Sequence, residues 1–132
     1  MRILGIDFGL KRVGVAISDE GRNFAFPKIV LPYSKAVAHK IAEICKVEEV
    51  SEVVLGESKD YGGRENDVMG EIRRLKGDLE AAGLAVYLEE EYGSSIEAAR
   101  FQGKRADNDS SAAAIILQRF LDKNSRDEQE VE

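Results

Sequence analysis

The chain opens with two apolar runs on either side of a short turn: Ile3-Leu4-Gly5-Ile6-Asp7-Phe8-Gly9-Leu10-Lys11-Arg12-Val13-Gly14-Val15-Ala16-Ile17-Ser18. The first run is largely apolar on both of its alternating sides, which predicts a strand buried on both faces near the middle of a sheet. The second run alternates valine and isoleucine with small residues, and the short connection contains a glycine, so the two runs predict a hairpin. One carboxylate, Asp7, ends the first strand, where burial is costly without positive charge or hydrogen bonds. Asp7 could bond to the backbone of its own turn, or it could be a metal ligand together with carboxylates from later in the chain.

The size and composition of the chain restrict its possible fold and location. With 132 residues, of which 43% are hydrophobic and 33% charged, the chain predicts one domain with a core that needs no disulfide or structural zinc. The single cysteine, Cys45, excludes an internal disulfide and a multi-cysteine metal site and fits a reducing compartment. No signal peptide fits before the first strand, and no apolar run approaches membrane-spanning length. The prediction is a cytoplasmic protein that does not contact a membrane.

The charge of the chain is uneven. The formal net charge is −6, which argues against a non-specific coat for nucleic acid, because such binding depends mainly on neutralising phosphates. Residues 122–132 contain five acids and two bases, and so carry −3 of that charge. We therefore expect a folded domain in residues 1–121 and an acidic, disordered tail in residues 122–132.

Strands and helices alternate after the hairpin. Strands are expected at residues 23–31, 52–56 and 85–88, and helices at residues 34–47, from the polar loop 57–64 to about residue 82, and at 94–99 and 107–121. Pro27 predicts an edge or a bulge in the third strand, and Ser34 is expected to cap the first helix. Because helices separate the later strands, these should be parallel, whereas the first three should be antiparallel. The sequence thus predicts an α/β fold with a mixed sheet flanked by helices.

Acidic residues occur at three distant points that should meet at one end of this sheet. Asp7 ends the first strand, residues 89–91 are three glutamates at the end of the last strand, and a third acidic group precedes the final helix. In parallel α/β sheets, sites form beyond the carboxyl ends of the strands. Asp109 shares one helix face with Ala113, Ile116 and Phe120, so it should be aimed at the sheet, whereas Asp107 suits a capping position.

Three converging carboxylates would repel one another without cations, but they suit one or two Mg²⁺ or Mn²⁺ ions. Such a site can activate a water molecule and stabilise both oxygens of an in-line phosphodiester displacement. No Ser/His/Asp set competes with it, because the single histidine, His39, is expected on a solvated helix face and Cys45 in a core stripe. Basic residues near this end could neutralise substrate phosphates; they are Lys11, Arg12, Lys59, Arg64, Arg100, Lys104 and Arg105.

Two motifs resemble those of the YqgF/RuvX family, RNase H-like proteins described as Holliday junction resolvases or pre-16S rRNA nucleases. They are Gly5-Ile6-Asp7-Phe8-Gly9-Leu10-Lys11-Arg12-Val13-Gly14-Val15-Ala16, with Ser18-Asp19 after it, and Asp109-Ser110-Ser111-Ala112-Ala113-Ala114-Ile115-Ile116-Leu117-Gln118. The resemblance extends from about Arg2 to Leu121. It implies a five-stranded mixed sheet flanked by helices and metal-dependent cleavage of nucleic acid. Asp7 and Asp109 take the catalytic aspartate positions.

The chain departs from the family pattern at two places. The middle motif of the family reads Asp-Glu-Arg, any residue, Thr-Thr and a later Glu-Ala, and here it is Glu90-Glu91-Tyr92-Gly93-Ser94-Ser95-Ile96-Glu97-Ala98. The resemblance places the catalytic glutamate at Glu91 and keeps the two hydroxyls as Ser94 and Ser95, but Tyr92 replaces the arginine. The family's Gly-Leu-Pro is Gly56-Glu57-Ser58 here, whereas Gly63 and Glu65 match. The resemblance thus implies intact metal ligands at Asp7, Glu91 and Asp109, with Glu90 or Asp107 as an outer ligand, and altered substrate contacts.

Three classes of function are open at this point. The first is a metal-dependent endonuclease of structured nucleic acid, acting on an RNA precursor as a monomer or on branched DNA, where symmetric cutting predicts a homodimer. The second is a nucleotide-binding domain, because the Asp7-Phe8-Gly9 turn also resembles the phosphate loop of the actin, Hsp70 and sugar kinase superfamily. Those proteins close two such domains over ATP, and this chain supplies one. The third is a nucleic-acid-binding protein without catalysis, which the two departures from the family pattern would fit.

Overall fold

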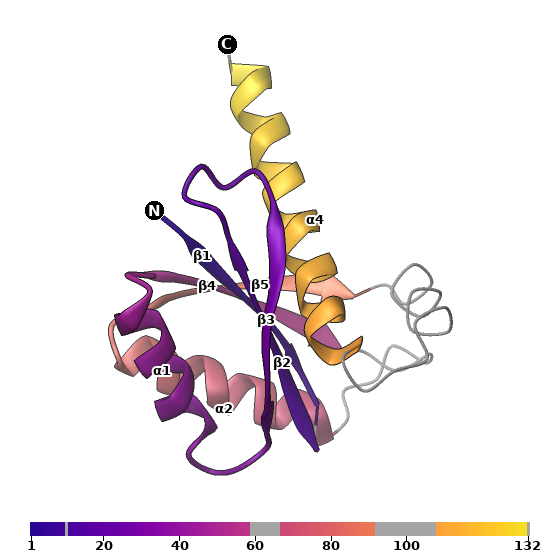
Figure 1. Cartoon of the computed structure of the whole chain (residues 1–132). Helices are drawn as coiled ribbons and strands as arrows, with labels where there is room; N and C mark the ends of the chain where they lie inside the picture. Colours follow the sequence, from indigo (N-terminus) through magenta and orange to yellow (C-terminus); the bar gives the residue numbers. More distant parts are fainter. Residues whose placement is uncertain (10, 59–66, 92–107, 132) are drawn as a thin grey trace.

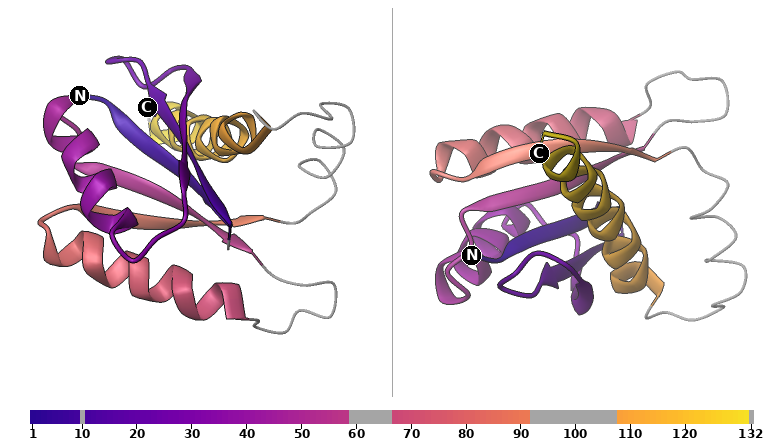
Figure 2. Two further views of the ribbon diagram at one scale, coloured as in Figure 1. Left: turned by 60° about the horizontal axis from the view of Figure 1, so that its bottom comes forward. Right: turned by 90° about the horizontal axis from the view of Figure 1, so that it is seen from above.

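The computed structural model describes residues 1–9, 11–58, 67–91 and 108–131. Five strands form one sheet, and they are β1 (Ile3–Phe8), β2 (Arg12–Ser18), β3 (Ala25–Pro32), β4 (Glu52–Ser58) and β5 (Ala85–Glu91). The described helices are α1 (Val37–Val47), α2 (Asp67–Ala81) and α4 (Asn108–Val131). Figures 1 and 2 show α1 and α2 on one face of the sheet and α4 on the other. The expected helix at residues 94–99 lies outside the described residues.

The sheet has the mixed topology that the sequence predicts. Its strand order is β3-β2-β1-β4-β5, so β1 is the central strand. The pairs β1–β2 and β2–β3 are antiparallel, and the pairs β1–β4 and β4–β5 are parallel. β3 lies at an edge, and the register of its pairing with β2 shifts opposite Pro27, as a proline inside a strand requires. The carboxyl ends of β1, β4 and β5 consequently meet at one end of the sheet.

Both faces of β1 are buried, each under a different layer of helices. Leu4, Ile6 and Phe8 belong to the larger core beneath α1 and α2. Ile3, on the other face, packs in a second core formed with α4. The alternation of the first apolar run therefore predicts the burial of this strand correctly, since all six of its residues are buried.

Helix α4 packs against β1 at a glycine. A Cβ atom added to Gly5 would lie 2.6 Å from Cβ of Leu117 and 3.1 Å from the carbonyl oxygen of Ala113. The first distance is too short for a real Cβ atom and the second is tight, so the absence of a side chain at Gly5 allows the helix to lie directly on the central strand. This contact fixes the position of the start of α4 relative to the end of β1.

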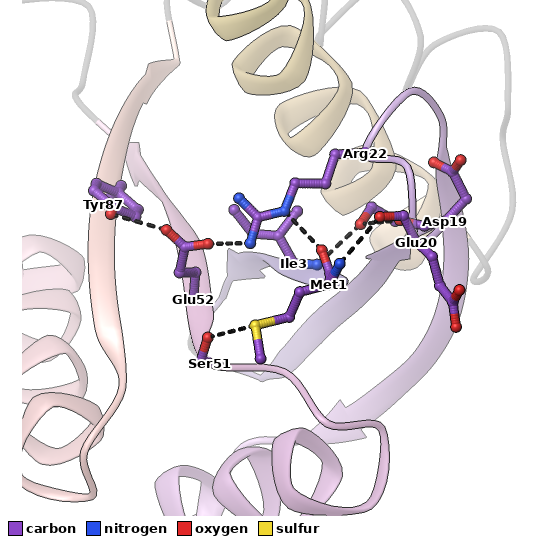
Figure 3. Close-up of polar contacts among 9 residues, drawn as sticks. Met1, Ile3, Asp19, Glu20, Arg22, Ser51, Glu52 and Tyr87 are labelled. Carbon is purple, nitrogen blue, oxygen red and sulfur yellow. Dashed lines mark hydrogen bonds and ion pairs between the residues drawn. The ribbon is translucent and has the colours of Figure 1, made fainter.

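A group of polar contacts ties the opposite end of the sheet together (Figure 3). Arg22, in the turn between β2 and β3, has a left-handed backbone with φ of 59°. Its guanidinium donates a hydrogen bond of 2.7 Å to the carbonyl oxygen of Met1 and pairs with the carboxylate of Glu52. The Tyr87 hydroxyl donates to the same carboxylate at 3.0 Å. Arg22 and Glu52 thus join the beginning of the chain to β4 and β5.

Several predicted element ends are wrong. Ser34 does not cap α1, which begins at Val37 with Ala36 at the capping position; the Ser34 hydroxyl instead accepts a hydrogen bond from the Ala36 amide at 3.2 Å. β4 continues through Glu57 and Ser58, which were expected in a loop, because both pair with β5.

The last helix was expected to end at Leu121 and continues to Val131, so the backbone of the acidic tail is helical up to that residue. Residues 122–131 contain neither glycine nor proline, and several of them favour helices. Where the folded domain ends stays a prediction. Across the described ranges, none of the helices combines the length and apolar character needed to cross a membrane.

Candidate active site

Asp7 is a buried carboxylate at the end of the central strand. Its backbone pairs with that of Gly14 in β2, and only 7% of the residue is exposed. Because side chains alternate along a strand, Asp7 lies on the same face as Gly5, the face covered by α4. A carboxylate so placed loses much of its hydration and needs hydrogen bonds or cations to remain charged.

The first turn of α4 lies beside this end of β1. The side chain of Gln118, in the middle of the helix, accepts a hydrogen bond from the Ala25 amide and donates one to the Asn23 carbonyl, both at 2.9 Å, at the beginning of β3. β3 runs in the same direction as β1, so α4 runs back from the carboxyl end of β1 toward its amino end, as Figure 1 shows.

The backbone of Asp109 lies toward the same end of the sheet as Asp7 (Figure 1). The backbone of Ala113 lies against Gly5. Asp109 is four residues before Ala113, and four residues span about 6 Å along the axis of a helix. Asp7 is two residues beyond Gly5, which is about 7 Å along a strand. From the contact between Gly5 and Ala113, both steps lead toward the carboxyl end of β1 (Figure 1). The backbone therefore places both aspartate positions toward one end of the sheet.

The third acidic position is the end of β5. The register pairs Gly56 with Glu89 and Ser58 with Glu91, so Glu91 is the last residue of the strand. One strand separates β5 from β1, which puts the two strand axes about 10 Å apart. Glu89 is 5% exposed and accepts a hydrogen bond of 2.9 Å from Lys123 of α4, so it lies on the α4 face. Glu91 occupies the next strand position of that face, and Glu90 a position of the opposite face.

Only some of the predicted substrate contacts can be placed. Lys11, just before β2, and Arg12, the first residue of β2, are exposed at the same end of the sheet as Asp7. Seven further predicted contacts lie outside the described residues: Lys59, Arg64, Ser94, Ser95, Arg100, Lys104 and Arg105. Tyr92 and Asp107 also lie there.

The side chains available at this end of the sheet as metal ligands suit a hard cation. His39 is exposed, with its Nε2 3.0 Å from a carboxylate oxygen of Glu43 in the same helix, and Cys45 is 1% exposed in the core, where burial raises the pKa of its thiol to about 11. Neither lies with the acidic residues, so carboxylate oxygens are the donors there, and these suit Mg²⁺ or Mn²⁺. No group of three histidine, cysteine or acidic side chains suited to hold a metal occurs among those described, which do not include the side chains of Glu91 and Asp109.

Two contacts near the site have no signal in the sequence. Lys123 belongs to the segment expected to be a tail, yet it pairs with the buried Glu89. Tyr33, after β3, donates a hydrogen bond of 2.9 Å from its hydroxyl to Glu71 of α2, and its ring meets that of Phe8 edge to face at 5.5 Å. Each contact joins two elements far apart in the chain. Neither belongs to a periodic pattern, so local sequence patterns do not reveal them.

Comparisons with known proteins agree with this geometry. The family model RuvX, described as Holliday junction resolvase, matches residues 1–123. A protein of Maridesulfovibrio salexigens named "Putative pre-16S rRNA nuclease" is 37% identical, over 92% of this chain and 98% of its own length. A protein of Bordetella petrii with the same name is 36% identical, over 91% and 94% of the two chains.

Two solved structures are similar in fold. T. thermophilus RuvC in complex with Holliday junction substrate aligns with a TM-score of 0.63 and 18% identity, over 95% of this chain and 96% of that one. The fowlpox virus Holliday junction resolvase aligns with a TM-score of 0.60 and 16% identity, over 93% and 99% of the two chains. The fold is therefore the RNase H-like fold of RuvC-like resolvases, as the sequence motifs imply.

Proposed function

The chain belongs to the RuvX family and is a nuclease, and we propose that it hydrolyses phosphodiester bonds of structured nucleic acid with divalent cations held by Asp7, Glu91 and Asp109. The observation that carries the proposal is the backbone placement of the three positions. They lie at the carboxyl end of β1, at the carboxyl end of β5 and in the first turn of α4, around one end of the sheet.

Each carboxylate comes from a different element in this proposal. Asp7 on the central strand, Asp109 in the first turn of α4 and Glu91 at the end of β5 would each supply carboxylate oxygens to the cations. Bound Mg²⁺ or Mn²⁺ would supply activation of the attacking water and stabilisation of the leaving oxygen. The burial of Asp7 supports this role, because a nearby cation offsets the cost of placing a charged group out of water.

The substrate we favour is a ribosomal RNA precursor. The two relatives described above, which match nearly the whole of this chain, carry the name "Putative pre-16S rRNA nuclease". Lys11 and Arg12, exposed beside Asp7, would contact phosphates of the bound strand. An RNA processor can act as a monomer in the cytoplasm. Branched DNA is the second candidate, favoured by the description of the family, and symmetric cutting of a junction would require a two-fold dimer.

Cleavage of labelled precursor RNA and of a four-way DNA junction, each with Mg²⁺, Mn²⁺ or EDTA, tests the proposal. Wild type should cut one substrate only when the ion is present, and both Asp7→Asn and Asp109→Asn should reduce the rate by at least about a hundredfold. Asp78→Asn, which changes an exposed aspartate of α2, is the matched control and should cut like wild type. Ion-independent inertness of all four proteins would instead favour a binding protein without catalysis.

A further inference from the structure

We propose that two copies of the chain associate through the outer edge of β5, where the two edge strands pair antiparallel about a two-fold axis and join the sheets. Three features of β5 carry the proposal: its contrast with the other edge strand, the direction of its backbone groups and its sequence. This association is independent of the proposed nuclease activity.

The two edge strands of the sheet differ in how readily they could accept another strand. β3 contains Pro27, Lys28 and Pro32, and the register of its pairing with β2 shifts within the strand. Prolines, lysines and bulges are features that protect a sheet edge from further pairing. β5 contains neither proline nor glycine, and its seven residues pair with β4 in an unbroken register. β5 therefore lacks the features that protect β3.

Large apolar side chains are exposed on both faces of β5. Tyr87 is 42% exposed and Leu88 is 43% exposed. The Tyr87 ring stacks on that of Phe120 of α4 with 5.4 Å between the centroids, and Leu88, one position further, lies on the opposite face of the sheet. An edge strand with exposed apolar side chains offers a surface for pairing with another chain.

The backbone of β5 presents hydrogen-bonding groups at this edge. The Ala85 amide donates a hydrogen bond of 3.0 Å to the carbonyl oxygen of Ser51, directly before β4. Because the backbone groups of successive strand residues point to opposite sides, those of Val86, Leu88 and Glu90 are directed away from β4. In the part of the chain that the structure describes, no strand pairs with these groups. They are the donors and acceptors that a further strand requires.

The sequence of β5 is self-complementary when two copies meet antiparallel with Leu88 opposite its own copy. The two Leu88 residues then exchange a pair of hydrogen bonds, and Val86 of each copy pairs with position 90 of the other. The glutamates at 89–91 lie opposite positions 87, 86 and 85, so no acid faces an acid. A register centred on Glu89 would place like charges opposite each other, which destabilises a sheet. The sequence thus favours a second copy, and the two-fold arrangement closes as a dimer.

An engineered disulfide tests the register. Directly opposite, hydrogen-bonded residues of antiparallel strands have Cα atoms about 5.5 Å apart, a separation that a disulfide can span. The single cysteine, Cys45, is 1% exposed, so Leu88→Cys adds an accessible thiol to a chain whose own thiol is buried. With oxidised glutathione as oxidant, Leu88→Cys should convert to a covalent dimer on non-reducing gels. Phe26→Cys, at an exposed apolar position of β3, is the matched control and should cross-link at least about tenfold more slowly.

Sedimentation velocity over a range of protein concentrations measures the association itself. Wild type should reach twice the mass of one chain as the concentration rises. Leu88→Lys places two like charges opposite each other at the axis and should raise the Kd of the dimer at least about tenfold. Phe26→Lys should associate like wild type. Circular dichroism and urea unfolding of both variants would verify that each chain remains folded.

The proposal is overturned if wild type sediments as a monomer at every concentration, or if the two lysine variants associate equally well. Equal rates of cross-linking in Leu88→Cys and Phe26→Cys would likewise exclude the register centred on Leu88. All of these measurements are made without nucleic acid or metal. Their outcome is therefore separate from that of the cleavage assay, and either proposal can fail alone.

Discussion

At the scale of single residues, Gly5 has the clearest structural requirement, because it determines how closely α4 approaches the central strand. We expect Gly5→Ala to destabilise the protein by about 1–3 kcal/mol, since the added Cβ would lie 2.6 Å from the Cβ of Leu117, an atom that cannot rotate away. Urea unfolding of wild type and variant measures this difference.

Gly70 provides the control for that experiment. It lies inside α2 and is exposed, and an added Cβ there would meet no atom within 4 Å. Gly70→Ala should therefore stabilise the protein by up to about 1 kcal/mol through helix propensity alone. Equal effects of the two substitutions would show that α4 does not pack on Gly5 as described.

Two partly buried carboxylates, Asp19 and Glu48, predict how stability depends on pH. Hydrogen bonds from the amides of Phe24 and Asn23 lower the pKa of Asp19 below its usual 3.8, and a hydrogen bond from Lys28 lowers that of Glu48 below 4.5. A group whose pKa is lower in the folded state stabilises the fold above its unfolded value, and this contribution is lost as the pH falls through the folded value. The free energy of unfolding should accordingly be level from pH 7 to about 5 and fall below 4.5.

Urea unfolding between pH 6 and pH 3, with Asp19→Asn beside wild type, checks this dependence. The amide oxygen of asparagine can still accept the two backbone bonds, but it does not titrate. The variant should therefore lose less stability than wild type below pH 4. If the free energy of unfolding falls by the same amount in both proteins, Asp19 does not contribute to the pH dependence.

At the scale of elements, α4 shows what an apolar pattern can and cannot reveal. Among the residues of α4 whose burial is described, up to Asn124, the last buried one is Leu121, which is also where the apolar periodicity ends. The helix nevertheless continues to Val131, since its polar end depends on helix propensity rather than on burial. The same limitation applies to β4, where Glu57 and Ser58 follow the apolar run and extend the strand by pairing with β5.

Truncation of α4 separates its packed part from its polar extension. Ile116, Leu117 and Leu121 pack in the core with the sheet, and Lys123 pairs with Glu89. A chain ending at Asn124 keeps all of these contacts, so its free energy of unfolding should lie within about 0.5 kcal/mol of wild type. A chain ending at Gln118 loses Leu121 and Lys123 and should unfold at clearly lower urea concentration. Loss of stability in the longer chain as well would mean that residues 125–132 contribute to the core fold.

At the scale of the whole molecule, the arrangement of the acidic positions was predictable because topology alone determines it. Parallel strands end at the same side of a sheet, so Asp7 and the glutamates of β5 had to share one end once the strand directions were known. The helical spacing predicts that Asp109 shares one helix face with Ala113 and Ile116, and Ala113 and Ile116 are fully buried in the core that α4 forms with the sheet. Contacts such as Tyr33 to Glu71 depend on how closely two elements approach in space, which no local pattern encodes.

Strand alternation also distinguishes two neighbouring glutamates that the sequence leaves equivalent. Glu91 holds a position of the sheet face that carries α4, where Asp7 and Asp109 are placed, and Glu90 holds a position of the opposite face. We therefore propose that Glu91, rather than Glu90, binds the metal directly.

Calorimetric titration of Mn²⁺ into the metal-free protein tests this assignment most directly. Wild type should bind the ion, and Asp7→Asn, Asp109→Asn and Glu91→Gln should each weaken binding by at least about tenfold, whereas Glu90→Gln should bind with nearly the affinity of wild type. Circular dichroism of each variant would verify that the fold is intact. Unchanged Mn²⁺ affinity in the three variants, or equal losses in Glu90→Gln and Glu91→Gln, would contradict a metal site built from the ends of β1 and β5 and the start of α4.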